Sequence, residues 1–189
     1  MQNFTDNESN RILDVKRKIT NRLATAMMAL PDDVCKLLKT GIVTGGISAS
    51  YFHNEKENDI DVYLSEPAAI LALKQFIANK TPEIMGAIQD INDKYNALEV
   101  EVAGKLVTPQ AVTFKSGIQI ITMDTVDARS KFDFEHCKPY YDIATDIYFI
   151  SRTQYDSITN KKLVLNMTGD GVSPDSKRLE KFVDRGWTL

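Results

Sequence analysis

A glycine pair followed by two closely spaced acids is the feature of this chain that most restricts its fold. Residues 41–50 read GIVTGGISAS, and Asp59 and Asp61 follow within the apolar run that ends at Leu64. Side chains alternate along a strand, so the two acids point to one face while Ile60 between them points to the other. Neighbouring carboxylates repel each other, and burying both is costly unless a positive charge lies between them. The pattern therefore predicts a strand with a cation site on one face.

A divalent metal ion with nucleotide phosphates satisfies these requirements. Carboxylate oxygens suit Mg²⁺ that is held together with substrate phosphates. Glycines allow a tight turn and let backbone N–H groups approach a phosphate, and the pair lies between a predicted strand at 42–44 and a predicted helix start at 47–52. Two plainer interpretations remain open: the acids are the exposed end of an edge strand, and the glycines form an ordinary turn.

Together these motifs resemble the nucleotidyltransferase superfamily typified by DNA polymerase beta. Its signature is Gly-Gly or Gly-Ser with a nearby Ser, a spacer, and an acid-x-acid motif on the second strand. Here twelve residues separate Gly46 from Asp59. The family also uses a third acid on a later strand, and Asp133 between Phe132 and Phe134 matches that setting.

The resemblance implies a fold, a reaction and a cofactor. The fold would be α+β, with a mixed β-sheet flanked by helices and a minimal nucleotidyltransferase core at about residues 40–137. The remainder would form helical N-terminal and C-terminal extensions of a single domain, 1–189. The implied enzyme is metal-dependent: with Mg²⁺ or Mn²⁺ it moves a nucleoside monophosphate from an NTP to a hydroxyl acceptor and releases pyrophosphate.

The resemblance also implies roles for individual residues. The triphosphate would be held by Gly45, Gly46 and Ser48, with Ser50 as an alternative hydroxyl. Two metal ions would be held by Asp59, Asp61 and Asp133. Asp133 would in addition act as general base or orient the attacking hydroxyl, with Glu135 as the alternative third acid.

A basic stripe near the C-terminus is a further candidate for phosphate binding. The stripe consists of Lys177, Arg178, Lys181 and Arg185, the first three of them on a helix predicted over residues 174–183. Glu180 and Asp184 are interleaved with these cations, so a solvated helix face is an equally good interpretation.

Hydrophobic periodicity predicts the other elements. Helices are expected at 9–30, from 31 to about 40, at 65–79 and from 81 onward. Strands are expected at 60–64, 98–102, 111–114, 118–123, 132–137 and 147–150.

Composition narrows the class of protein and of partner. The chain has 189 residues with 43% hydrophobic and 26% charged residues, as expected for one globular domain. It lacks an apolar run of the roughly 20 residues needed to span a bilayer, and it lacks a secretory signal. Its only cysteines are Cys35 and Cys137. We therefore expect a cytoplasmic protein without membrane contact. The net charge of −3 argues against an extended nucleic-acid footprint, and leaves an RNA end, a nucleotide, a small molecule or a protein as acceptor.

Two stretches resemble small uncharacterised nucleotidyltransferase-like proteins of tailed phages. These are residues 132–142 and the ending 177–187. They imply a bacteriophage protein that acts in the host cytoplasm. The alternatives to an enzyme are a non-catalytic nucleotide-binding or protein-interaction module on a degenerate scaffold, and a structural virion or host-takeover protein.

Overall fold

The computed structural model describes residues 4–30, 32–57, 59–64, 66–78, 107–108, 111–114, 116–121, 129–166, 174 and 176–189. The helix predicted from residue 81 and the strand predicted at 98–102 lie outside these residues.

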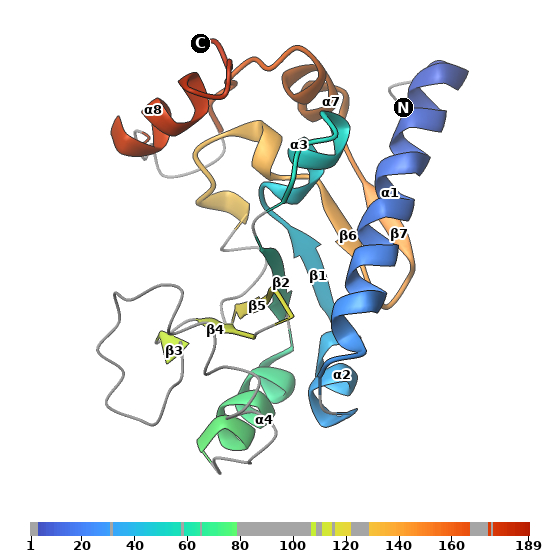
Figure 1. Cartoon of the computed structure of the whole chain (residues 1–189), viewed down its shortest axis with the longest axis vertical. Coiled ribbons are helices and arrows are strands. Elements are labelled where there is room, and N and C mark those ends of the chain that lie inside the picture. Colours follow the sequence, from blue (N-terminus) through green and yellow to red (C-terminus); the bar gives the residue numbers. More distant parts are fainter. Residues whose placement is uncertain are drawn as a thin grey trace.

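The chain begins with a long amphipathic helix, α1, which spans Asp6–Met27 (Figure 1). Its apolar residues Val15, Ile19, Leu23 and Ala26 are buried, as their three- and four-residue spacing predicts. The helix starts three residues before the predicted start because Thr5 and Glu8 form a capping box. The Glu8 N–H donates to Thr5 Oγ1 at 3.3 Å, and the Thr5 N–H donates to Glu8 Oε2 at 2.8 Å.

The described strands form one mixed sheet of seven strands in the order β3-β4-β5-β2-β1-β6-β7. They are β1 (Gly41–Thr44), β2 (Ile60–Leu64), β3 (Val107–Thr108), β4 (Ala111–Thr113), β5 (Ile118–Ile121), β6 (Tyr140–Asp142) and β7 (Ile147–Phe149). The pair β2 and β5 is parallel, and the other neighbours are antiparallel. The predicted α+β class with a mixed sheet is confirmed, and β3 and β6 are strands that periodicity did not predict.

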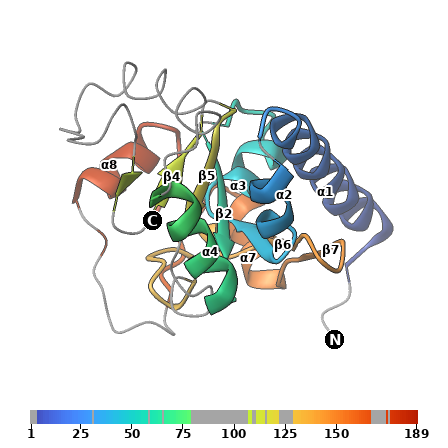
Figure 2. The same ribbon diagram turned by 90° about the horizontal axis from the view of Figure 1, so that it is seen from below.

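Helices flank this sheet. They are α2 (Asp32–Leu38), α3 (Ile47–Phe52), α4 (Pro67–Ala78), α7 (Arg152–Thr159) and α8 (Ser176–Val183), with a 3₁₀ turn η1 at Glu135–Cys137. Helix α1 packs against α3. Figures 1 and 2 place α1 and α8 on opposite sides of the molecule, with the sheet and α3 between them. Within the described part of the chain, no helix is both long and apolar enough to cross a bilayer.

The strand predicted at 132–137 is wrong. Phe134 makes only an isolated bridge with Leu165, and the residues after it turn into η1. Phe134 and His136 are both fully buried, and both rings contact Phe182 of α8. The apolar residues of this stretch therefore serve as packing beneath α8, and the third acid of the predicted site stands on a loop.

Candidate functional site

The glycine turn between β1 and α3 lies directly against an acid of β2. Gly45 has φ +97°, a conformation that other residues rarely adopt, and a Cβ atom there would lie 2.9 Å from Asp61 Oδ2. The Gly45 N–H donates to the carbonyl of Cys137 at 3.0 Å, and this hydrogen bond connects η1 to the glycine turn. Gly46 differs, because among the described residues no atom lies within 4 Å of its would-be Cβ. Within this turn, Gly46 is therefore the glycine whose backbone has open space beside it.

Alternation along β2 determines the face of Asp61. Ile60 and Val62 are fully buried in the core, which leaves Asp61 on the opposite face, and Asp59, directly before the strand, lines the same cavity as Asp61. Burial, and then the charge of Asp59, raises the pKa of Asp61 to about 7, although Arg178 and Lys181 act in the opposite direction. The repulsion that the spacing predicts is therefore present, and a cation on this face would relieve it.

The third predicted acid is paired with an arginine of α8. Arg178 Nε lies 2.6 Å from Asp133 Oδ2, and the Asp133 side chain is only 9% exposed. The other oxygen, Oδ1, is buried and has no hydrogen-bond partner among the described residues. Arg178 also influences the pKa of Asp61, so one guanidinium lies within electrostatic range of both acids.

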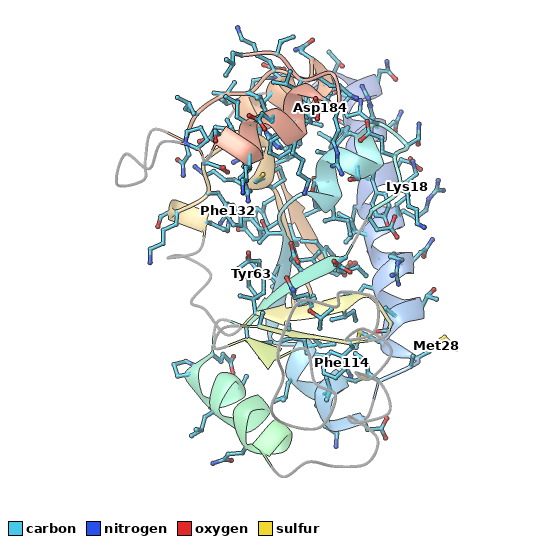
Figure 3. The ribbon with its side chains drawn as sticks, turned by 60° about the vertical axis from the view of Figure 1, so that its left-hand side comes forward. Lys18, Met28, Tyr63, Phe114, Phe132 and Asp184 are labelled. Carbon is cyan, nitrogen blue, oxygen red and sulfur yellow. The ribbon has the colours of Figure 1, made fainter. Side chains whose placement is uncertain are left out.

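Two cavities meet at these residues. The first, of about 290 Å³, is bordered by the glycine turn, by the acidic face of β2 and by α8 with the turn that follows it. The second, of about 320 Å³, is bordered by the same turn, by β2 and by the loop that carries Asp133. Both cavities are lined by Gly46, Asp61, Cys137 and Arg178. Figure 3 shows Tyr63 of β2 and Phe132 of that loop as neighbours on one side of the sheet, and both line the second cavity.

Comparison with known families establishes the relationship of the chain. Residues 14–161, more than half of the chain, match the family model described as Gabija anti-defense 2 family protein. The chain belongs to the Gabija anti-defense 2 family. This is a phage anti-defence family, in agreement with the phage association predicted from the sequence.

The same match corrects the superfamily assignment drawn from the sequence. The Gabija anti-defense 2 family is not identified as a polymerase beta-like nucleotidyltransferase family, so membership of that superfamily is wrong. The absence of the strand at 132–137 removes one of the features on which the resemblance depended. No curated protein and no solved structure matches the chain.

In this family member, most of the predicted site residues gather at the two cavities. The first is lined by Gly46, Asp59, Asp61, Arg178 and Lys181, and the second by Gly45, Gly46, Asp61, Asp133 and Arg178. Lys177 lies on α8 but lines neither cavity.

The predicted hydroxyl group is on the wrong side of α3. Ser48 is only 1% exposed, faces the interior near Tyr148, and lines neither cavity. The alternative, Ser50, lines the first cavity. The other alternative residue, Glu135, is engaged elsewhere: its carboxylate accepts a hydrogen bond from Lys138 at 2.9 Å.

The structure adds residues that the sequence reasoning had not assigned to the site. Glu55 and Glu57 line the first cavity, and each is held by an ion pair, with Lys161 at 2.8 Å and with Arg22 at 2.9 Å. Tyr63 lines the second cavity. The sequence could have predicted this position, because Tyr63 follows Asp61 by two residues on a strand and residues i and i+2 share a face.

Two neighbours of the site are unsuited to acid–base or nucleophilic chemistry. Burial, and then the charge of Arg178, lowers the pKa of His136 to about 3, so its ring is neutral and packs 4.2 Å from Trp187. Burial raises the pKa of Cys137 to about 12, so its thiol stays protonated. Both residues contribute to packing beside the site.

The acids fit a metal ion only in part. Within the described residues, no group of three or more His, Cys, Asp or Glu side chains is arranged to hold a metal. Asp133 is paired with Arg178, which separates it from the predicted three-carboxylate centre. Asp59 and Asp61 remain as two carboxylates, a donor set that suits an ion whose other ligands are substrate phosphates and water.

Proposed function

We propose that this Gabija anti-defense 2 family chain is a metal-dependent nucleotidyltransferase that moves a nucleoside monophosphate from an NTP to a hydroxyl acceptor. One observation carries the proposal: Gly46, Asp61 and Arg178 border both cavities. An open glycine backbone and a guanidinium are phosphate-binding groups, and a buried carboxylate is a ligand for Mg²⁺. The site geometry supports the reaction independently of any relation to DNA polymerase beta.

The first cavity suits the triphosphate. Arg178 and Lys181 of α8 line it, and so does Arg185 in the turn after that helix. Asp59 and Asp61 line the same cavity. A triphosphate in this cavity would be attracted by the cations and repelled by the acids, which favours binding together with a divalent ion. A bound Mg²⁺ or Mn²⁺ would offset this repulsion and withdraw charge from the phosphates.

Asp133 is placed to orient the attacking hydroxyl. Arg178 holds its Oδ2 at 2.6 Å, which fixes the carboxylate in one orientation. The carboxylate would accept a hydrogen bond, and then the proton, from an acceptor hydroxyl at the small part of this side chain that stays exposed. Positioning of this kind supplies a large part of the rate enhancement when two substrates must meet.

The family description supports a purpose for this activity. The matched family is named for action against the Gabija defence, and we assign the same purpose to this chain. A second candidate is a non-catalytic nucleotide-binding or protein-interaction module with that purpose. It is favoured by one observation, the Asp133–Arg178 ion pair, which leaves no three-carboxylate group among the described residues.

Nucleotide binding is expected to stabilise the chain, and thermal unfolding with each NTP plus Mg²⁺ or Mn²⁺ measures it. A ligand at 100 times its Kd adds about 2.7 kcal/mol, or about 5–11 °C for a domain of this size. Lys181→Ala should reduce the shift because it removes a cation from the first cavity. Lys177→Ala, on the same helix but lining neither cavity, should leave the shift unchanged.

The outcomes separate the candidates. A shift together with pyrophosphate release in the presence of an acceptor supports the transferase. A shift with no release from any acceptor tried, including nucleotides, RNA ends and host proteins, favours the non-catalytic module. No shift with any NTP would reject both nucleotide-binding proposals.

A further inference from the structure

The second cavity is lined by both apolar and charged residues. The apolar ones are Tyr63, Phe132 and Pro174, and the charged ones include Lys131, Asp133 and Arg178. The rings of Tyr63 and Phe132 meet edge to face, with centroids 6.1 Å apart and planes at 75° (Figure 3). An apolar surface beside a few convergent polar groups is the usual composition of a small-ligand pocket, and a volume of about 320 Å³ suits a small organic molecule.

One polar atom of these charged residues lacks a hydrogen-bond partner among the described residues. The Asp133 side chain is nine-tenths buried, and its Oδ1 accepts no hydrogen bond from any described residue. An unsatisfied buried carboxylate oxygen costs free energy, so a ligand that turns this carboxylate toward the cavity and donates to it gains binding energy. A hydroxyl group is such a donor.

We infer that the second cavity binds the acceptor, and that the acceptor is itself a nucleotide. This inference rests on the proposed transfer reaction. The base packs against Phe132 and Tyr63, a ribose hydroxyl donates to the Asp133 carboxylate, and the phosphate lies near the positive charge of Lys131, an exposed residue of the lining. The net charge of −3 favours a free mononucleotide over the end of a long nucleic acid.

The shared border of the cavities lets the two substrates react. The acceptor hydroxyl gives its proton to the Asp133 carboxylate, and its oxygen forms a bond to the α-phosphorus of the NTP in the first cavity. The bond from the α-phosphorus to the oxygen that bridges to the β-phosphate breaks. Pyrophosphate leaves with that electron pair, and the product is a dinucleotide joined by a phosphodiester.

Calorimetric titration tests the second site directly. The whole chain is saturated with Mg²⁺ and a non-hydrolysable α,β-methylene analogue of the NTP that gives the largest thermal shift. AMP, GMP, CMP and UMP are then titrated separately, followed by a trinucleotide with a free 3′ hydroxyl. We expect one mononucleotide to bind in addition to the analogue. Phe132→Ala should weaken it at least tenfold, and Phe149→Ala, an exposed aromatic of β7 that lines neither cavity, should not.

Lys131→Ala keeps the test valid if Phe132→Ala fails to fold, because Lys131 is exposed. It should weaken the mononucleotide several-fold and leave the matching nucleoside, which has no phosphate, unaffected. Tighter binding of the trinucleotide, with the same sensitivity to Phe132→Ala, would support the pocket and identify a nucleic-acid end as the source of the hydroxyl.

Other results overturn the inference. A mononucleotide that displaces the analogue, or whose affinity is unchanged in both Phe132→Ala and Lys131→Ala, occupies the first cavity or another surface. Binding of the analogue without binding of any mononucleotide or trinucleotide rejects this acceptor pocket and leaves the proposed transfer reaction standing. Absence of analogue binding would instead count against the proposed function itself.

Discussion

Asp61→Asn is expected to abolish nucleotidyl transfer, with a loss of at least about 10³-fold, which corresponds to about 4 kcal/mol of transition-state stabilisation. Asparagine is nearly the same size as aspartate, but its neutral oxygen cannot offset the charge of a divalent ion beside phosphates. Release of pyrophosphate from the NTP under saturating acceptor measures the loss. Asp184→Asn is the matched control, because Asp184 is exposed near the end of α8 (Figure 3) and lines neither cavity.

The same substitution should stabilise the fold, which separates a lost function from a lost structure. The folded-state pKa of Asp61, about 7, is above its ordinary value of 3.8, so the folded chain binds this proton more tightly than the unfolded chain does. The stability of the wild type therefore falls as the pH rises from about 4 to about 7, and the full penalty is present above that range.

Asparagine carries no such penalty. Its advantage in the free energy of unfolding should grow over this pH interval to at most about 4 kcal/mol, since one pKa unit corresponds to about 1.4 kcal/mol. Denaturant unfolding of both proteins from pH 4 to pH 8 measures this advantage.

For the wild type, the stabilisation by NTP with Mg²⁺ should also be larger at pH 8 than at pH 6, because the ion must displace the proton from Asp61. If Asp61→Asn transferred the nucleotide at the wild-type rate, Asp61 would have no role in the reaction.

Local patterns predicted the part of the site that is local in sequence. Asp61 lies on the face of β2 opposite Ile60 and Val62 because alternation is a property of the strand itself, and β2 has the predicted bounds. The start of α1 was also readable, since Thr5 and Glu8 have the spacing of a capping box, as do Ser151 and Gln154 at the start of α7.

Long-range packing decided what the sequence could not. The run of alternating apolar residues around Asp133 is typical of a strand, yet Phe134 and His136 are buried against Phe182, almost fifty residues away along the chain. That contact sets where Asp133 lies and which cation it meets. Likewise, Ser48 and Ser50 are two positions apart on a helix and point in different directions. Only the packing of α3 determines that Ser50 reaches the cavity.

Gly45→Ala is expected to destabilise the chain by about 2–4 kcal/mol, a fall of about 4–16 °C in the unfolding temperature. Two causes add. Gly45 has φ +97°, which strains any residue with a Cβ, and that Cβ would lie 2.9 Å from Asp61 Oδ2. Relief of the contact would move either the turn or the carboxylate, so the thermal shift with NTP and Mg²⁺ should fall as well.

The neighbouring glycine provides the control for this prediction. Gly46 has φ −73°, an ordinary helical value, and its would-be Cβ meets no described atom within 4 Å. Gly46→Ala should therefore leave the stability unchanged or raise it by less than about 1 kcal/mol, through the lower entropy of the unfolded chain. Because Gly46 borders both cavities, the added methyl group should still weaken nucleotide binding. Equal stability losses in the two variants would contradict the turn geometry, whereas unchanged nucleotide binding in Gly46→Ala would mean that phosphates do not approach this backbone.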